Sequence, residues 1–149
     1  MNGVMMHSRW LMLALFILIW VNDSGAYIVG SLMAKRKGGN HKMFPRVSPA
    51  KSWEGLIGGF IFDLMAGYVF FRVGWTTDMG LANSLLFALI VGVFGTLGDL
   101  MESLFKRTLG VKDSGKLMPG HGGALDRFDS LLLAVPVVYF FFVYLPTIL

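Results

Sequence analysis

Residues 98–130 have the sequence GDLMESLFKRTLGVKDSGKLMPGHGGALDRFDS. This stretch holds five of the nine acidic residues and five of the thirteen basic residues of the chain, and apolar segments flank it on both sides. Hydrophobic residues make up 55% of the 149 residues and charged residues only 15%, whereas a soluble domain has about 25% charged residues. The pattern predicts an all-α, polytopic membrane protein, a single domain over residues 1–149, with a Gly-rich charged loop that handles charged substrates at a bilayer surface.

The apolar segments predict about four transmembrane helices, because a helix needs about 20 residues to cross a bilayer. They cover residues 10–34, 55–73, 81–97 and 130–149. The first is interrupted by Asn22-Asp23-Ser24, and polar groups at membrane depth are costly unless they face a protein interior or a wet cavity. These residues are therefore candidate site elements. A competing interpretation is a signal peptide with an apolar core over residues 10–21 and the small residues 24–26 behind it.

The loop from Lys35 to Lys51 contains six basic residues and no acidic one. Such a loop indicates the cytoplasmic side of a membrane, or contact with anionic head groups, rather than a nucleic-acid partner. Its glycines and prolines break any helix. Ser52 is then a plausible N-cap for the next helix, and Glu54 complements the positive end of the helix dipole. Two crossings separate this loop from residues 98–130, so both are expected on the cytoplasmic face.

Asp63 stands in the middle of the apolar segment 55–73. It is either a buried relay or ligand, or an acid that faces a polar seam between helices, and the second interpretation is favoured. Gly58, Gly59 and Gly67 in the same segment would let neighbouring helix backbones approach closely.

Three aspartates of the charged block are candidate metal ligands. Asp126 and Asp129 are three residues apart, so on a helix their side chains share one face. With Asp99 from another segment they suit Mg²⁺, which takes oxygen ligands and completes its shell with substrate phosphates. Acidic pairs of this spacing also occur on many solvated helices.

Cations and glycines are interspersed with those acids. The cations could hold phosphates and offset charge on a transferring phosphoryl group, although mixed charge is also typical of a solvated face. The glycines could let the backbone wrap closely around an anion. His121 could bond a phosphate or a base, or be structural. The cations are Lys106, Arg107, Lys112, Lys116 and Arg127, and the glycines are Gly110, Gly115, Gly120, Gly122 and Gly123.

Several motifs together resemble one known family. In the charged block they are SLFKR from Ser103, KDSG from Lys112, PGHGG from Pro119 and DRFD from Asp126. NDSGAY from Asn22 and SPAKSWEG from Ser48 precede them in the expected order. This combination is similar to the C-terminal half of phosphatidate cytidylyltransferases, also called CDP-diacylglycerol synthases.

The resemblance implies a multi-pass enzyme of the cytoplasmic (inner) membrane whose active site faces the cytoplasm. It would transfer CMP from CTP to phosphatidic acid, giving CDP-diacylglycerol and pyrophosphate, with Mg²⁺ as cofactor. A second, monovalent cation and a homodimer are left open. The implied catalytic residues are Asp99, Lys106, Arg107, Lys112, Asp113, His121 and Arg127. The implied substrate-binding residues are Asn22, Asp23, Ser48, Lys51, Ser103, Gly122 and Gly123. The implied metal ligands are Asp99, Asp126 and Asp129.

Two other hypotheses are weighed against this one. A CDP-alcohol phosphotransferase would need a DGxxAR stretch, which the sequence does not contain. A truncated, non-catalytic membrane protein that binds phospholipid or a partner subunit is the alternative from another class. Members of the resembled family are typically near twice this length, and their additional helices would be expected to shield the glycine-lined seams and Asp63.

Overall fold

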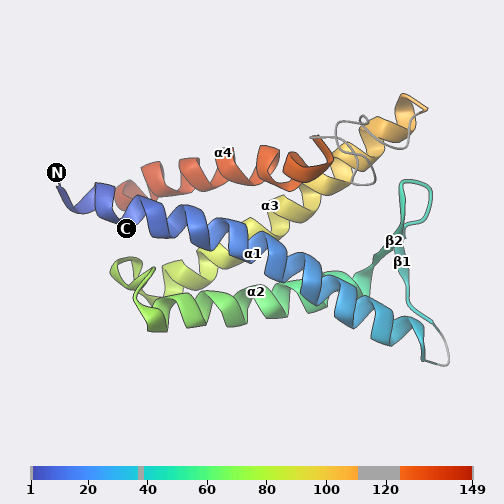
Figure 1. The fold of residues 1–149 in the computed structure, drawn as a ribbon, viewed down its shortest axis with the longest axis horizontal. Helices are drawn as coiled ribbons and strands as arrows, with labels where there is room; N and C mark the ends of the chain where they lie inside the picture. Colours follow the sequence, from blue (N-terminus) through green and yellow to red (C-terminus); the bar gives the residue numbers. More distant parts are fainter. Residues whose placement is uncertain (1, 37–38, 111–124, 149) are drawn as a thin grey trace.

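The computed structural model describes residues 2–36, 39–110 and 125–148, with side chains described for residues 10–36, 39–110 and 130–142. Within these residues the chain forms helices and one short hairpin (Figure 1). The helices are α1 (Asn2–Ala34), α2 (Trp53–Val73), α3 (Gly80–Thr108) and α4 (Leu125–Ile148), with a 3-10 turn η1 (Thr77–Met79) before α3. The hairpin pairs β1 (Lys42–Phe44) with β2 (Ser48–Ser52) in antiparallel fashion.

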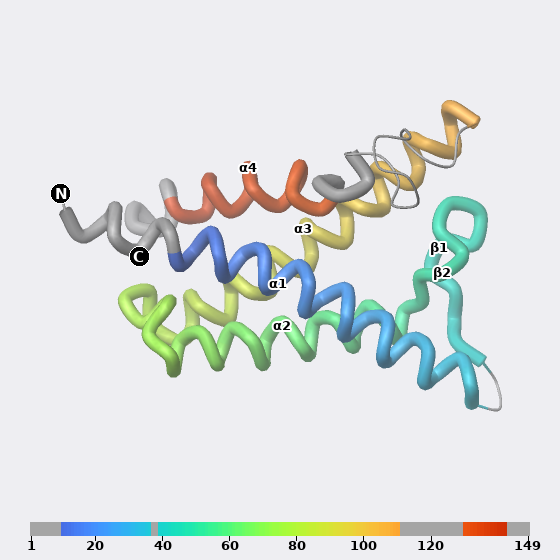
Figure 2. Tube along the Cα trace, viewed as in Figure 1, coloured from blue at the N-terminus to red at the C-terminus, as the bar shows by residue number. Residues whose placement is uncertain are grey.

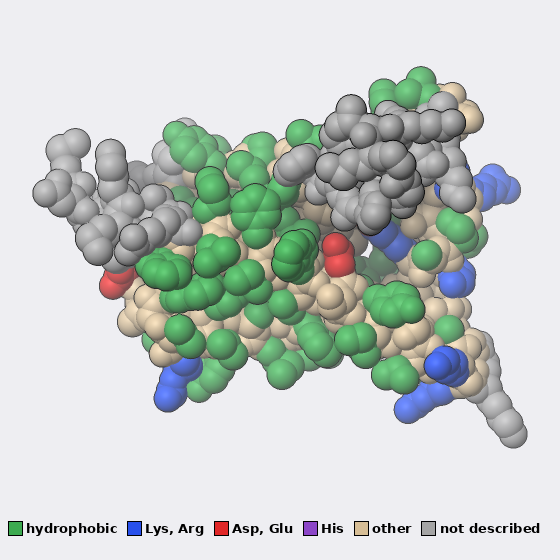
Figure 3. All heavy atoms as spheres, in the orientation of Figure 1, with side chains coloured by type: hydrophobic (Ala, Val, Ile, Leu, Met, Phe, Trp, Pro, Cys, Tyr) green, Lys and Arg blue, Asp and Glu red, His purple; other side chains and the backbone are tan. Residues whose placement is uncertain are grey.

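Three helical segments among the described residues are long and apolar enough to cross a membrane: Trp10–Ala34, Trp53–Val73 and Thr77–Thr108. The apolar part of α4 with described side chains, Ser130–Phe142, is shorter. Hydrophobic side chains cover most of the visible surface of the helices in Figure 3, and most of the visible Lys and Arg side chains gather at the end that carries the hairpin. The prediction of an all-α polytopic membrane protein is confirmed.

The helices alternate in direction. α1 packs mainly against α2, and α3 packs against both α2 and α4. In Figures 1 and 2, α2 runs away from the hairpin and α3 returns, so the hairpin and the last turns of α3 lie at the same end. The basic loop and the start of the charged block thus share one end of the molecule, as the sequence predicts. The core at the other end is formed by residues such as Leu18, Phe87 and Val91, which are almost fully buried.

Capping residues fix both ends of α2. At its start the Ser52 hydroxyl accepts a hydrogen bond from the Gly55 backbone N–H at 3.2 Å, which confirms the predicted N-cap. At its end Gly74 adopts φ 94°, a left-handed conformation that favours glycine, and its N–H closes the last turn. The helix is 21 residues long, close to the length that spans a bilayer.

The hairpin differs from the sequence expectation, which was only a helix-breaking loop. Its strands are anchored to the neighbouring helices: the Trp53 N–H donates to the His41 carbonyl at 3.0 Å, and Glu54 Oε1 lies 2.6 Å from His41 Nδ1. Asn40 Nδ2 donates to the Gly30 carbonyl of α1 at 3.1 Å. These contacts join residues 10 to 13 positions apart, so strand propensity alone could not reveal them.

Candidate functional site

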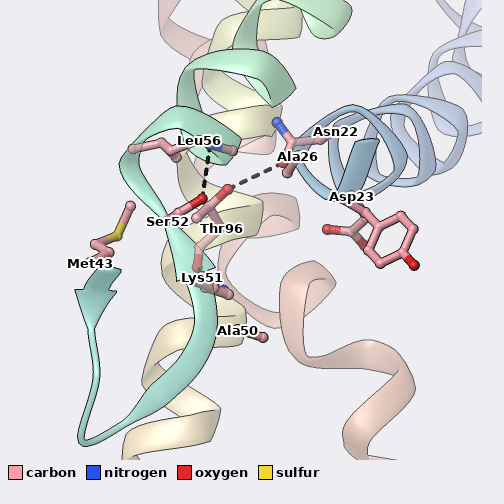
Figure 4. Close-up of a pocket in the computed structure, with 11 residues that line it drawn as sticks. Asn22, Asp23, Ala26, Met43, Ala50, Lys51, Ser52, Leu56 and Thr96 are labelled. Carbon is pink, nitrogen blue, oxygen red and sulfur yellow. Dashed lines mark hydrogen bonds between the residues drawn. The ribbon is translucent and has the colours of Figure 1, made fainter. Parts of the chain in front are cut away.

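A pocket of about 190 Å³ lies between the hairpin and α1, α2 and α3. Figure 4 shows that side chains from α1, β2 and α3 converge on it. It is lined by Asn22, Asp23, Ala26 and Tyr27 of α1, Met43, Ala50, Lys51 and Ser52 of the hairpin, Gly55 and Leu56 of α2, and Thr96 of α3. Two of the predicted substrate-binding motifs, around Asn22 and around Lys51, therefore meet in one place.

The deep wall of the pocket is a chain of hydrogen bonds across three helices. Thr96 Oγ1 donates to Asn22 Oδ1 at 3.3 Å, and Asn22 Nδ2 donates to Asp63 Oδ2 at 2.5 Å. Asn22 is 5% exposed and Asp63 is fully buried. The favoured interpretation of Asp63, an acid in a polar seam, is confirmed. The expectation that additional helices would be needed to shield it is wrong, because this chain's own helices bury it.

The Lys51 side chain connects this pocket to the charged block. Its ammonium forms an ion pair with Asp99 Oδ2 and lies 3.5 Å from the Thr96 carbonyl. The Lys51 side chain is 21% exposed and that of Asp99 is 34% exposed, so the pair sits at the border of the interior. Asp99 does not line the pocket itself. The ion pair nevertheless places this predicted catalytic acid and metal ligand directly beside it.

The predicted metal site can be compared with the structure only in part. Asp126 and Asp129 belong to the first turns of α4, and their side chains lie outside the described residues. Among the side chains that are described, no three acidic or histidine groups lie close together. Asp99 is therefore the one predicted ligand with a described side chain. A single partly exposed carboxylate is compatible with Mg²⁺, which proteins hold through one or two carboxylates together with substrate phosphates.

The other predicted site residues on α3 and β2 with described side chains do not line the pocket. Lys106 Nζ pairs with Glu102 Oε1 at 3.3 Å, and Arg107 Nε donates to the Val47 carbonyl of the hairpin turn at 3.4 Å. Ser48 begins β2, and Ser103 is half-buried on α3. Lys112, Asp113, His121, Gly122 and Gly123, together with the Arg127 side chain, lie outside the described residues.

Two features of the buried polar residues were not predicted from the sequence. Sequence reasoning did not pair Asn22 with Asp63, although both are polar residues within apolar segments. It also gave no role to Glu102, which is 8% exposed and lines a second, mainly apolar pocket of about 500 Å³ between α3 and α4. The four-residue spacing of Glu102 and Lys106 on one helix was the signal for that pair.

Known proteins similar to this chain carry the name phosphatidate cytidylyltransferase. The one from Haemophilus influenzae is 45% identical over 139 residues, which cover 91% of this chain and 46% of that protein. The one from Staphylococcus haemolyticus is 48% identical over 124 residues, 83% of this chain and 45% of that protein. The chain thus spans about half the length of the curated relatives it matches. The model of the cytidylyltransferase family matches residues 3–145, and the chain belongs to this family.

Proposed function

We propose that this chain transfers CMP from CTP to phosphatidic acid, giving CDP-diacylglycerol and pyrophosphate, at the cytoplasmic face of the cell's inner membrane. The observation that carries the proposal is the meeting of Asn22, Lys51 and Asp99, from three separate stretches, around one pocket at the basic end of the molecule. The names of the relatives described above support the choice of substrates.

In this reaction a phosphate oxygen of phosphatidic acid attacks the α-phosphorus of CTP. The new bond joins that oxygen to the α-phosphorus, and the bond from the α-phosphorus to the bridging oxygen of the β-phosphate breaks. Pyrophosphate leaves with the electron pair. Phosphatidic acid is already an anion at neutral pH, so little help from a general base is needed. The barrier lies in bringing two anions together and stabilising the leaving group.

The described residues supply positive charge for this task. The Lys51 ammonium lies in the pocket wall, where Asp99 and the Thr96 carbonyl hold it, and it would contact a bound phosphate. Lys106 and Arg107 add two cations further along α3. We propose that Asp99, with Asp126 and Asp129, holds Mg²⁺, which when bound neutralises phosphate charge.

The test of this proposal is turnover by the purified full chain in detergent with CTP, Mg²⁺ and phosphatidic acid. Radiolabel from the α-phosphate of CTP should appear in the lipid phase as CDP-diacylglycerol, and Asp126→Asn should abolish this while leaving expression largely unchanged. Folded protein that forms no product would exclude the proposal for this chain. If such protein still bound phosphatidic acid vesicles, it would favour the non-catalytic alternative.

The orientation has its own test, which uses the absence of cysteine from the chain. Single cysteines would be introduced as Lys35→Cys at the basic end and as Ala82→Cys near the start of α3, both at exposed positions. An impermeant thiol reagent should label Lys35→Cys only in inside-out membrane vesicles and Ala82→Cys only in right-side-out ones. The reverse pattern would invert the proposed topology.

A further inference from the structure

The most unusual group outside the proposed chemistry is the carboxylate of Asp63. It is fully buried in the middle of α2, and its Oδ1 has no hydrogen-bond partner among the described residues. An acid within a membrane-spanning helix is costly and is kept where it serves a function. A neutral side chain could satisfy the Asn22 amide at lower cost, since it would leave no carboxylate oxygen unpaired. The presence of the acid therefore needs an explanation beyond helix packing.

The helices around this carboxylate leave room for it. A Cβ atom at Gly92 of α3 would overlap Asp63 Oδ2 and would lie 2.9 Å from Asn22 Nδ2. A Cβ atom at Gly59 of α2 would lie 3.1 Å from the same nitrogen. Two helices thus omit a side chain at the point where Asn22 and Asp63 meet, and the pair is enclosed closely on both sides.

The contact with Asp63 also determines which way the Asn22 amide points. A carboxylate oxygen that carries no proton can only accept hydrogen bonds, so Oδ2 in this form requires the NH₂ end of the amide to face it. The carbonyl end then faces Thr96, whose hydroxyl donates to it. With the amide reversed, two oxygens would face each other at Asp63 and the Thr96 hydroxyl would lose its acceptor. Both Asn22 and Thr96 line the pocket, and the Thr96 carbonyl also accepts from Lys51.

We propose that Asp63 is a positioning residue that fixes the Asn22 amide, and through it the Thr96 hydroxyl, in the wall of the pocket that receives a phosphate-bearing substrate. It does not touch the substrate and takes no part in bond making. The identity of the substrate rests on the proposed function, whereas the fixed geometry of the wall does not.

Kinetics can separate positioning from plain stabilisation. Asp63→Ala leaves the buried amide without its acceptor, and we expect KM for CTP or phosphatidic acid to rise on the order of tenfold, with a smaller change in kcat. Asp63→Asn keeps the size but can turn either its oxygen or its NH₂ toward Asn22, so it no longer fixes the amide, and KM should rise by about threefold or more. The matched control is Gly67→Ala, whose Cβ would lie 2.8 Å from that of Ala88 on the same α2–α3 seam. It should lower the unfolding temperature and leave KM unchanged.

A second measurement does not depend on catalysis. Ala26→Cys places a thiol in the pocket lining, in a chain that has no other cysteine. Combined with Asp63→Ala, its rate of reaction with a soluble thiol reagent should change by about fivefold or more, because the adjacent wall loses its fixed geometry. Combined with Asp63→Asn the rate should change in the same direction by a smaller factor, and combined with Gly67→Ala it should stay within about twofold. The remote thiol of Ala82→Cys should react at the same rate in all backgrounds.

The two proposals fail in different ways. If the unsubstituted chain forms no product but the Ala26→Cys rate responds to Asp63→Ala, the positioning role stands and the proposed function falls. If Asp63→Ala lowers the unfolding temperature as Gly67→Ala does, with KM and the labelling rate both unchanged, Asp63 only holds helices together and the positioning role is overturned. Should Asp63→Ala not fold, an Asp63→Asn variant whose KM and labelling rate both match those of the unsubstituted chain would overturn it as well.

Discussion

Polar groups are held in two different ways at the polar seam, formed by Asn22, Asp63 and Thr96, and at the charged end, where Lys51 meets Asp99. In the seam they are bonded across three helices, and Asn22 and Asp63 are buried. At the charged end the two side chains form an ion pair and keep 21% and 34% of their surface exposed. The hydrogen bonds of the seam fix the positions of its side chains, whereas the partly exposed ion pair at the charged end can separate when a ligand binds.

This difference has an energetic consequence. Partly exposed ion pairs contribute little to stability, about 0–1 kcal/mol. Buried polar groups that lose a partner leave an unsatisfied atom, which costs about 1–3 kcal/mol. Substitutions at the charged end should therefore affect chemistry and spare the fold, while substitutions in the seam should lower stability in addition to any effect on KM.

The largest effect is expected at the charged end. Asp99→Asn removes a proposed metal ligand and the partner of Lys51, so turnover should fall by about 100-fold or more, since even the outer partners of metal ligands are worth about 10- to 100-fold. The unfolding temperature should change little. The rate of CDP-diacylglycerol formation measures turnover, and thermal unfolding in detergent measures the unfolding temperature. Asp78→Asn, the same change at the opposite end of the helices, is the control and should leave turnover intact. An unfolding temperature that drops with Asp99→Asn would remove the distinction between the two regions.

An intermediate effect is expected in the seam. Gly92→Ala forces a Cβ against Asp63 and Asn22, and overpacking of this kind costs about 1–3 kcal/mol. The control lies on the same helix one turn later: a Cβ at Gly95 would meet its nearest atoms at 3.8 Å, an ordinary contact. Gly95→Ala should therefore unfold near the temperature of the unsubstituted chain. Equal unfolding temperatures for the two variants would show that the seam is less closely packed than the structure indicates.

The smallest effect is expected where the two regions join, at the cap of α2. Ser52→Ala removes the hydroxyl that accepts from the Gly55 N–H, and loss of such a cap costs about 1 kcal/mol. Ser31→Ala removes an exposed hydroxyl that only bonds back to the Ile28 carbonyl of its own helix, and it should be neutral. Denaturant unfolding of both variants gives their free energies of unfolding, which can be compared directly. A Ser52→Ala variant as stable as Ser31→Ala would mean that the hairpin contacts alone hold the start of α2.

The elements of the fold follow from local signals. Apolar length predicts the spans, the serine before Trp53 predicts the start of α2, and an acid within an apolar segment predicts a polar seam. The hairpin was not predictable, because β1 has only three residues and β2 contains Pro49, while the contacts that hold it involve Gly30 and Glu54. The Asn22–Asp63 pair joins positions 41 residues apart, and no periodicity specifies such a partner. Of the predicted metal ligands, only Asp99 could be located by its side chain.

The depth of Asp63 has a consequence for the surrounding lipid. Asp63 lies ten residues after Trp53 on α2, which at about 1.5 Å per residue is about 15 Å from the hairpin end, half of a hydrocarbon layer about 30 Å thick. Asn22, which touches it, belongs to the pocket wall. A substrate phosphate that contacts Asn22 would lie deeper in the bilayer than one that contacts only Lys51 and Ser52 at the hairpin end of the pocket. The proposed function therefore predicts that the leaflet beside the pocket is dimpled, so that a lipid is brought to the reacting groups by a local depression of the bilayer and not by leaving it.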